Sequence, residues 1–203
     1  MNLNLELKYN NFNHNEALDG GALYLFNLLK ENNNIPMYHM KLENNTFFKN
    51  HARNFGGALY IDFDKFDLLS IKNNEIFNNN ADIMGGGLFS FNLNKTFNSN
   101  DMYIYNNTAN SLNNDYSSKP SLILLQTELT EKNLNITSGK HLPLLFYLYD
   151  EYGNFINDIS NFYSDISIKI VLEEVNDENN IEKEYLNLFG NECTFINGNY
   201  FQK

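Results

Sequence analysis

The chain has 203 residues, of which 42% are hydrophobic and 15% aromatic, so it can bury a core in one or two domains and is not expected to be disordered. Its formal net charge is −11, with no cluster of lysine or arginine. Such a chain has neither the basic surface that binds nucleic acid nor an attraction to anionic lipid. We therefore expect no nucleic-acid partner and no membrane contact by this segment.

Targeting signals and cysteine chemistry are also missing from the sequence. The longest unbroken apolar run, 142–149, is far shorter than the roughly 20 residues that cross a bilayer. The residues that follow Met1 lack the basic and apolar regions of a signal peptide. A single cysteine, Cys193, excludes an intramolecular disulfide and a cysteine-based zinc site, and is interpreted as a small buried hydrophobe.

One phrase recurs along the first half of the chain: an apolar residue, Asn three positions later, Ala two positions after that, and then a Gly-Gly pair that opens an alternating apolar run. Its copies contain Phe12, Asn15, Ala17, Gly20 and Gly21; Phe47, Asn50, Ala52, Gly56 and Gly57; Ile76, Asn79, Ala81, Gly85 and Gly86; and, without the glycines, Ile104, Asn107 and Ala109. The second glycines lie 36 and 29 residues apart, a period typical of one large turn of a β-solenoid.

Short alternating apolar stretches precede the first three copies, and they predict strands. They are Leu3-Leu5-Leu7, Met40-Leu42 and Leu69-Ile71. Three short strands per turn, separated by Asn and Gly bends, predict a parallel β-helix. The additional residues between Leu25 and Met40 are expected to bulge out as a loop.

Four asparagines occupy the same place in the repeat: Asn15, Asn50, Asn79 and Asn107. Equivalent residues on successive turns lie about 4.8 Å apart, so their side-chain amides are expected to form a hydrogen-bonded ladder along the axis. Asn also tolerates the left-handed backbone of a tight bend. Ala fits where the wall turns inward, and paired glycines permit positive φ or a close backbone approach.

This phrase resembles the Phe-x-x-Asn and Gly-Gly-Ala-Ile repeats of the polymorphic outer-membrane-protein type, within the pectin-lyase-like β-helix superfamily. The resemblance covers residues 1–118 and implies a right-handed parallel β-helix of about four coils. Such repeats serve adhesins, receptor ectodomains and polysaccharide-cleaving enzymes alike, so the resemblance implies a fold more than an activity. The enzymes need clustered aspartates or a Lys/Arg base on one coil face, and we find no such set.

The repeat stops near 117–120, and the β-branched, alternating sequence that follows predicts a second domain over 119–203. Five segments are predicted as antiparallel strands: 121–126, 133–137, 142–149, 165–173 and 194–201. Residues 138–143 and 149–154 resemble filamin-type and bacterial immunoglobulin-like modules, and Gly190, Phe195, Asn197, Gly198 and Tyr200 resemble their later hairpin. This resemblance implies an immunoglobulin-like β-sandwich. Because such modules continue with further strands, we expect truncation at the C-terminus.

The predicted fold class is therefore all-β: a right-handed parallel β-helix followed by a partial immunoglobulin-like β-sandwich. Read as a piece of a longer protein, the chain is expected to be marginally stable alone, because its first strand and its last sandwich strands lack partners.

Acidic and histidine residues give no convincing site. Two groups contain oxygen ligands of the type that calcium prefers: Asp62, Asp64 and Asp67, and Asp150, Asn154 and Asp158. The first group lacks the turn glycine and closing glutamate of a calcium loop, and turn chemistry at Gly153 explains the second. The histidines, which do not share one row of the repeat, are His14, His39, His51 and His141. We expect no metal, no cofactor and no catalytic residue.

Three aromatic residues, Tyr24, Tyr60 and Phe89, share one place in successive copies. If the aliphatic residues beside them point inward, alternation turns these rings outward. There they are candidate ligand-facing residues for sugar rings, with Asn amides as hydrogen-bonding partners. The alternative is that they belong to the core or cover the wall.

Four Asn-x-Ser/Thr sequons are candidate N-glycosylation sites: Asn44, Asn94, Asn106 and Asn135. They favour an extracellular protein, although a sequence so rich in Asn also produces sequons by chance.

These features favour a non-enzymatic cell-surface or secreted scaffold, adhesin-like or the extracellular part of a larger membrane receptor. Its candidate partners are glycans, surface proteins and further domains of the same polypeptide. The alternative is a piece of a carbohydrate-active β-helix enzyme, a polysaccharide lyase or glycoside hydrolase, whose catalytic coils lie N-terminal to this piece. Paired acidic residues or a calcium-plus-arginine cluster on one strand face of those coils would distinguish the two.

Overall fold

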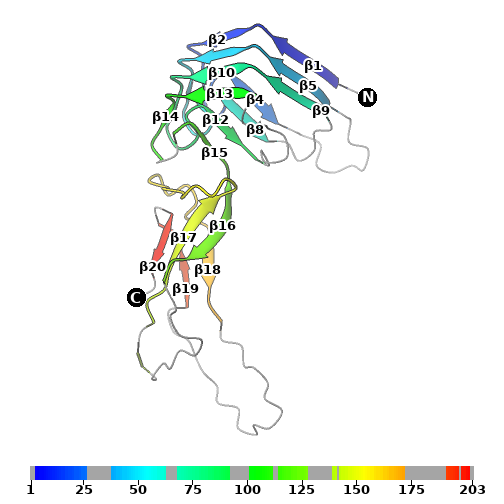
Figure 1. Ribbon diagram of the computed structural model, residues 1–203. Helices are drawn as coiled ribbons and strands as arrows, with labels where there is room; N and C mark the ends of the chain where they lie inside the picture. The colour runs from blue at the N-terminus through cyan, green and yellow to red at the C-terminus, as the bar shows by residue number, and fades with distance from the viewer. Residues whose placement is uncertain are drawn as a thin grey trace.

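The structure is a computed structural model that describes residues 3–26, 38–62, 68–91, 101–111, 114–127, 139–140, 142–171, 191–196 and 198–201. Every regular element in these ranges is a β-strand, and no helix occurs among them. The prediction of an all-β fold is therefore confirmed. Parallel strands form the first part of the chain and antiparallel strands the second (Figure 1). The expected loop between Leu25 and Met40 lies almost wholly outside the described residues.

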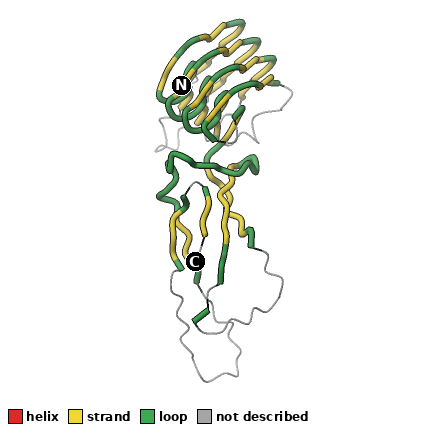
Figure 2. Tube along the Cα trace, turned by 90° about the vertical axis from the view of Figure 1, so that its left-hand side faces the viewer, coloured by secondary structure: helices red, strands yellow, loops and turns green. Residues whose placement is uncertain are grey.

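Four stacked parallel sheets make up the first part (Figure 1). The first contains β1 (Leu3–Lys8), β5 (Tyr38–Glu43) and β9 (Leu68–Lys72); the second contains β2 (Asn11–Asn13), β6 (Thr46–Phe48), β10 (Asn74–Phe77) and β13 (Met102–Tyr105). The third contains β3 (Glu16–Ala17), β7 (His51–Ala52), β11 (Asn80–Ala81) and β14 (Thr108–Ala109); the fourth contains β4 (Leu23–Phe26), β8 (Leu59–Asp62), β12 (Leu88–Ser90) and β15 (Tyr116–Ser117). Successive turns of the chain lie side by side in Figure 2. This arrangement is compatible with a parallel β-helix.

The strand register pairs equivalent positions of the repeat. Phe12 pairs with Phe47, which pairs in turn with Ile76. The rings of Phe12 and Phe47 stack with their centroids 4.8 Å apart. Ala52 likewise pairs with Ala17 on one side and Ala81 on the other. Residues of one kind therefore form columns along the stack.

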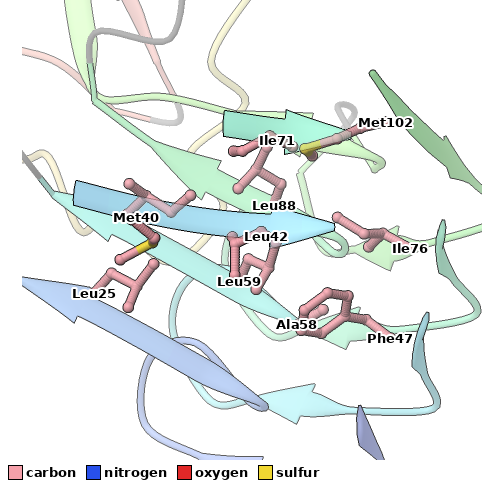
Figure 3. Close-up of a cluster of buried hydrophobic side chains, with 11 residues drawn as sticks. Leu25, Met40, Leu42, Phe47, Ala58, Leu59, Ile71, Ile76, Leu88 and Met102 are labelled. Atoms are coloured by element: carbon pink, nitrogen blue, oxygen red, sulfur yellow. The ribbon is translucent and has the colours of Figure 1, made fainter. Parts of the chain in front are cut away.

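Alternation along each strand decides which side chains fill the interior. In β8, Leu59 and Ile61 are buried, whereas Tyr60 and Asp62 are partly exposed. The buried side chains of successive turns meet in one cluster inside the stack (Figure 3), which contains Leu25, Met40, Leu42, Phe47, Ala58, Leu59, Ile61, Ile71, Ile76, Leu88 and Met102. Full burial of such a side chain stabilises the fold by about 1.5–3 kcal/mol, so this cluster is the main source of cohesion in the stack.

Two corners of each turn require a left-handed backbone. The residues there are Tyr9, Asn44 and Asn73 at the first corner, and His14, Lys49, Asn78 and Asn106 at the second. Each immediately precedes an asparagine of the stack. The ladder asparagines themselves do not have a left-handed backbone. The residue before them does, and four of these seven are Asn, which tolerates positive φ.

The two glycines of each pair are needed for different reasons. Gly56 has a φ of +67°, which favours glycine. Gly57 does not have a left-handed backbone, but a Cβ on it would overlap the carbonyl oxygens of Gly86 and Asn80. The first glycine thus permits the turn, and the second permits successive turns to approach closely.

The second part contains two antiparallel sheets. One joins β16 (Pro120–Leu125), β17 (Leu145–Asp150) and β20 (Asn199–Phe201), and the other joins β18 (Ser167–Lys169) and β19 (Glu192–Thr194). The predicted strands 121–126, 142–149 and 165–173 overlap β16, β17 and β18, whereas 133–137 lies outside the described residues. The single strand predicted over 194–201 is wrong. This segment is divided between the two sheets, and Gly198, with a φ of +73°, lies before β20.

A second apolar cluster joins the two parts. It contains Phe55, Met84 and Phe89 from the parallel sheets, and Leu148, Ile156 and Phe195 from the antiparallel region. These six side chains are at most 7% exposed. Asp150 adds hydrogen bonds at this junction, because its carboxylate accepts the N–H groups of Ser118, Tyr152 and Asn154. Burial nevertheless raises the pKa of the Asp150 carboxyl above its ordinary value.

We expect Gly57→Ala to lower the free energy of unfolding by about 3 kcal/mol, because the added methyl group meets backbone atoms that no rotamer change can move. Gly153→Ala is the control. Its φ of +77° makes alanine strained, but its Cβ would meet nothing within 4 Å, so a loss of about 1–2 kcal/mol is expected. Chemical denaturation measures both. Equal losses would contradict the close approach of successive turns at Gly57.

Candidate functional site

The four predicted ladder asparagines are joined by hydrogen bonds between neighbouring turns. The backbone N–H and the Nδ2 of Asn50 both donate to Oδ1 of Asn79, each at 2.9 Å. The same pair of bonds joins Asn15 to Asn50, at 3.0 and 2.8 Å, and Asn79 to Asn107, at 2.9 and 2.9 Å. Every bond points the same way, with donors on the earlier turn and the acceptor on the later one. The ladder therefore has a direction.

The remaining amide hydrogens of the ladder are also used. Nδ2 of Asn50 donates to the carbonyl oxygen of Phe12, and Nδ2 of Asn79 donates to that of Phe47, at 3.0 and 3.1 Å. Nδ2 of Asn107 donates in the same way to the carbonyl oxygen of Ile76. A buried amide is tolerated only when its donors and acceptor are paired. Asn50 and Asn79, each 1% exposed, meet this condition.

Asp115 ends this ladder. Its Oδ1 accepts the N–H and the Nδ2 of Asn107, at 2.9 and 3.0 Å, where another asparagine would otherwise stand. An ionised carboxylate accepts hydrogen bonds and donates none, so the row cannot continue beyond it. Asp115 was not predicted from the sequence, because it follows Asn107 by only eight residues and breaks the spacing of the repeat.

A second ladder runs parallel to the first and was also missed. Asn10 donates through its N–H and Nδ2 to Oδ1 of Asn45, both at 3.0 Å, and Asn45 donates likewise to Asn74, at 3.0 and 2.9 Å. Each member lies five positions before a member of the first ladder. That constant spacing was visible in the sequence and could have identified the second row.

The predicted aromatic row is stacked, but its members differ in exposure. Ring centroids of Tyr24 and Tyr60 lie 4.8 Å apart, and those of Tyr60 and Phe89 lie 5.5 Å apart, with nearly parallel planes in both pairs. Tyr24 is 49% exposed, whereas Phe89 is 1% exposed. The expectation that Phe89 faces a ligand is wrong, because the apolar cluster shared with the antiparallel region covers it. Tyr60 is covered on both ring faces, so Tyr24 holds the open end of the stack.

The surroundings of Tyr24 form a small mixed surface, which we call the Tyr24 patch: Tyr24, Phe26, Tyr60, Asp19 and Asp62. Phe26 is 39% exposed, and its ring centroid lies 6.0 Å from that of Tyr24. Partial burial and then the carboxylates of Asp19 and Asp62 raise the pKa of Tyr24. Burial and then the carboxylate of Asp62 raise the pKa of Tyr60 by more than that of Tyr24. Both hydroxyls therefore stay protonated at neutral pH and can donate hydrogen bonds.

A second aromatic column on the outside of the stack was not predicted. Phe48, Phe77 and Tyr105 come from β6, β10 and β13, with centroid separations of 4.8 and 5.3 Å. Lys49 lies over the Phe48 ring at 4.8 Å, and the edge of His14 approaches it. Each member follows an inward-pointing residue of the repeat, which is the signal that could have revealed the column.

The other predicted sites are placed separately. Of the sequons, Asn44 and Asn106 lie at left-handed corners, and Asn106 is exposed. Asn94 and Asn135 lie outside the described residues, as do Asp64, Asp67 and His141.

The calcium candidates that the structure describes are used locally. Asp150 is bonded to Asn154 within one turn, and Asp158 accepts the N–H groups of Phe162 and Tyr163. Nε2 of His51 lies 3.0 Å from Oδ1 of Asp82. Among the described residues, no three His, Cys, Asp or Glu side chains are grouped to hold a metal.

A small cavity lies between the two parts of the chain. It has a volume of about 150 Å³ and is lined by Asp82, Ile83, Asn110, Ser111, Asn157, Ile159 and Ser160. This volume is smaller than the roughly 300–1,000 Å³ that is common for small-molecule sites.

Comparisons with known proteins attach no family to this geometry. No protein-family model, curated protein or solved structure matches the chain. In the part of the chain that the structure describes, no helix has the length and apolarity needed to span a membrane.

We expect Asn79→Ala to lower the free energy of unfolding by roughly 3–5 kcal/mol, because it leaves the buried N–H and one Nδ2 hydrogen of Asn50 without an acceptor and removes a donor to Asn107 Oδ1 and to the Phe47 carbonyl oxygen. Asn15→Ala is the matched control. Asn15 is exposed and its side chain makes one ladder bond, so the expected loss is under about 1 kcal/mol. Urea denaturation compares the two. Similar losses would show that the ladder does not stabilise the interior.

Proposed function

We propose that the chain is a non-enzymatic recognition scaffold, cell-surface or secreted, that binds neutral glycans through the Tyr24 patch. In this proposal a right-handed parallel β-helix of about four coils carries the patch, and a partial immunoglobulin-like β-sandwich follows it. The stacked parallel sheets support the first assignment, and the two antiparallel sheets support the second. The observation that carries the binding proposal is the half-exposed Tyr24 ring at the open end of an aromatic stack.

The chemistry of the Tyr24 patch suits a sugar ring. The C–H face of a pyranose packs against an open aromatic face, and its hydroxyls donate hydrogen bonds to carboxylates such as Asp19 and Asp62. The same carboxylates and the net charge of −11 repel acidic sugars. Neutral glycans are therefore the favoured class.

The ring of Tyr24 is also held in place before any ligand arrives. Its strand, β4, pairs with β8, and its ring stacks on Tyr60, whose other face packs on Phe89. A side chain that is already ordered loses little conformational entropy on binding. The buried Phe89 thus contributes indirectly by supporting the row.

We expect Tyr24→Ala to weaken binding of neutral β-linked hexasaccharides by roughly two- to tenfold, the effect of losing one aromatic contact. Tyr103→Ala is the control, because Tyr103 is 56% exposed on β13, away from the patch. Isothermal titration calorimetry measures both. No binding at millimolar sugar, or equal loss in the two variants, would overturn the glycan proposal.

We further expect no release of reducing ends from polygalacturonate or from the neutral hexasaccharides. Glycoside hydrolysis needs one carboxyl free to act as an acid and another as base or nucleophile. Oδ1 of Asp19 instead accepts the N–H of Phe55, on the following turn of the stack, at 3.2 Å. A reducing-end assay tests this. Turnover that disappears in Asp62→Asn would establish an enzyme and refute the scaffold proposal.

A further inference from the structure

The cavity between the two parts of the chain, which we call the junction cavity, has no role in glycan binding. Three segments line its volume of about 150 Å³: Asp82 and Ile83 after β11, Asn110 and Ser111 after β14, and Asn157, Ile159 and Ser160 after β17. Described strands precede and follow each segment, so internal parts of the chain form the cavity.

The charges around the junction cavity are negative. Among the described residues that line it, Asp82 is charged and none is Lys, Arg or His. Nε2 of His51 lies 3.0 Å from Oδ1 of Asp82, and Oδ2 has no hydrogen-bond partner among the described residues. Asp158, which is 3% exposed, adds a second carboxylate behind Ser160. Together with the net charge of −11, these carboxylates attract cations and repel anions.

The polar groups of the junction cavity are set to accept hydrogen bonds. Oγ of Ser160 donates its hydrogen to Oδ1 of Asp158 at 3.0 Å, so the Ser160 oxygen remains as an acceptor. The ionised carboxylate of Asp82 accepts and does not donate. The side chains of Asn110 and Asn157 have no hydrogen bond to another described residue, and each amide offers an oxygen to the cavity. An ammonium group has three N–H donors, which matches Asp82, Ser160 and one of these amides.

The remaining wall of the junction cavity suits an alkyl chain. Ile83 and Ile159 line it, and Ile159 is 58% exposed. The methylene groups of an amine pack on such side chains while the charged end keeps its hydrogen bonds. The volume is about half the lower end of the range of roughly 300–1,000 Å³ for small-molecule sites, so the space fits a group of side-chain size better than a ring system.

We propose that the junction cavity binds a primary ammonium group at the end of a short alkyl chain. The ammonium donates to Asp82 Oδ2 and Ser160 Oγ, and the alkyl chain lies against Ile83 and Ile159. Both a free alkylamine and a lysine side chain of a partner protein carry this chemistry.

Other cations fit the junction cavity less well. A guanidinium group prefers to bind both oxygens of a carboxylate, and Oδ1 of Asp82 is already held by His51. Calcium takes about six to eight oxygen ligands, whereas Asp82 is the one carboxylate among the described lining residues and two isoleucines occupy part of the wall.

The test titrates the isotope-labelled full chain with n-butylammonium chloride, followed by the amide signals in NMR spectra in about 0.15 M salt. We expect saturating shifts at Asp82, Ser111 and Ser160, with a dissociation constant on the order of 1–10 mM for so small a ligand. Two control ligands separate the contributions: 1-butanol keeps the alkyl chain without the charge, and tetramethylammonium keeps the charge without N–H donors. Both should bind at least about fivefold more weakly.

Two variants of equal charge locate the site. Asp82→Asn removes the carboxylate at an exposed position and should weaken n-butylammonium binding at least about fivefold. Glu75→Gln removes the same charge from an exposed position on β10 and should leave the affinity within about twofold. Unchanged amide signals outside the cavity check that each variant is folded.

A peptide identifies the source of the ammonium group. An acetylated and amidated pentapeptide with one central lysine between glycines replaces n-butylammonium in the same titration. Binding at least about tenfold tighter, with further shifts at the 52% exposed Phe162, would support a lysine of a partner protein. Equal or weaker binding of the peptide would support a free alkylamine.

Three results would overturn the proposal. The first is the absence of saturating shifts at Asp82, Ser111 and Ser160 up to about 50 mM n-butylammonium. The second is equal binding of 1-butanol, or equal loss of affinity in Asp82→Asn and Glu75→Gln, either of which would show unspecific association. The third is displacement of n-butylammonium by calcium chloride at about 5 mM, which would identify a metal site instead. Because these residues lie outside the Tyr24 patch, none of these results depends on glycan binding.

Discussion

The structure depends on pairing buried amides along the axis of the stack. Each interior ladder asparagine uses its oxygen twice and its Nδ2 toward both neighbouring turns, as Asn79 does between Asn50 and Asn107. Such bonds form only when turns are in register. The register then aligns all the remaining columns of equivalent residues, because neighbouring strands keep the same spacing. Rings stack on rings and alanines on alanines for this reason.

The ladders also explain why the two ends of the stack differ. A row of amides that all donate in one direction has acceptors free at one end and donors free at the other. Asp115 uses the donors at the late end, while Asn10 and Asn15 keep their oxygens at the early end. At the same early end, Tyr24 is the first ring of the row that continues through Tyr60 to Phe89.

Packing between the two parts decides which surfaces stay open. Phe55 and Phe89 lie on the outside of the parallel sheets but are buried by Leu148, Ile156 and Phe195. The same row of aromatic residues is therefore core at one end and exposed surface at the other. Asp150 strengthens this junction by accepting the Ser118 N–H where the chain passes from β15 to β16.

The sequence by itself determined the parallel, all-β stack and its columns, because a repeat places the same side chain at the same corner of each turn. Asn15, Asn50, Asn79 and Asn107 were identified by spacing alone, and so were the glycines that permit close approach. Only the tertiary structure decided which columns stay open. Burial of Phe89 depends on Phe195, more than one hundred residues away. The end at Asp115 and the division of residues 194–201 between two sheets depend likewise on contacts that no local pattern records.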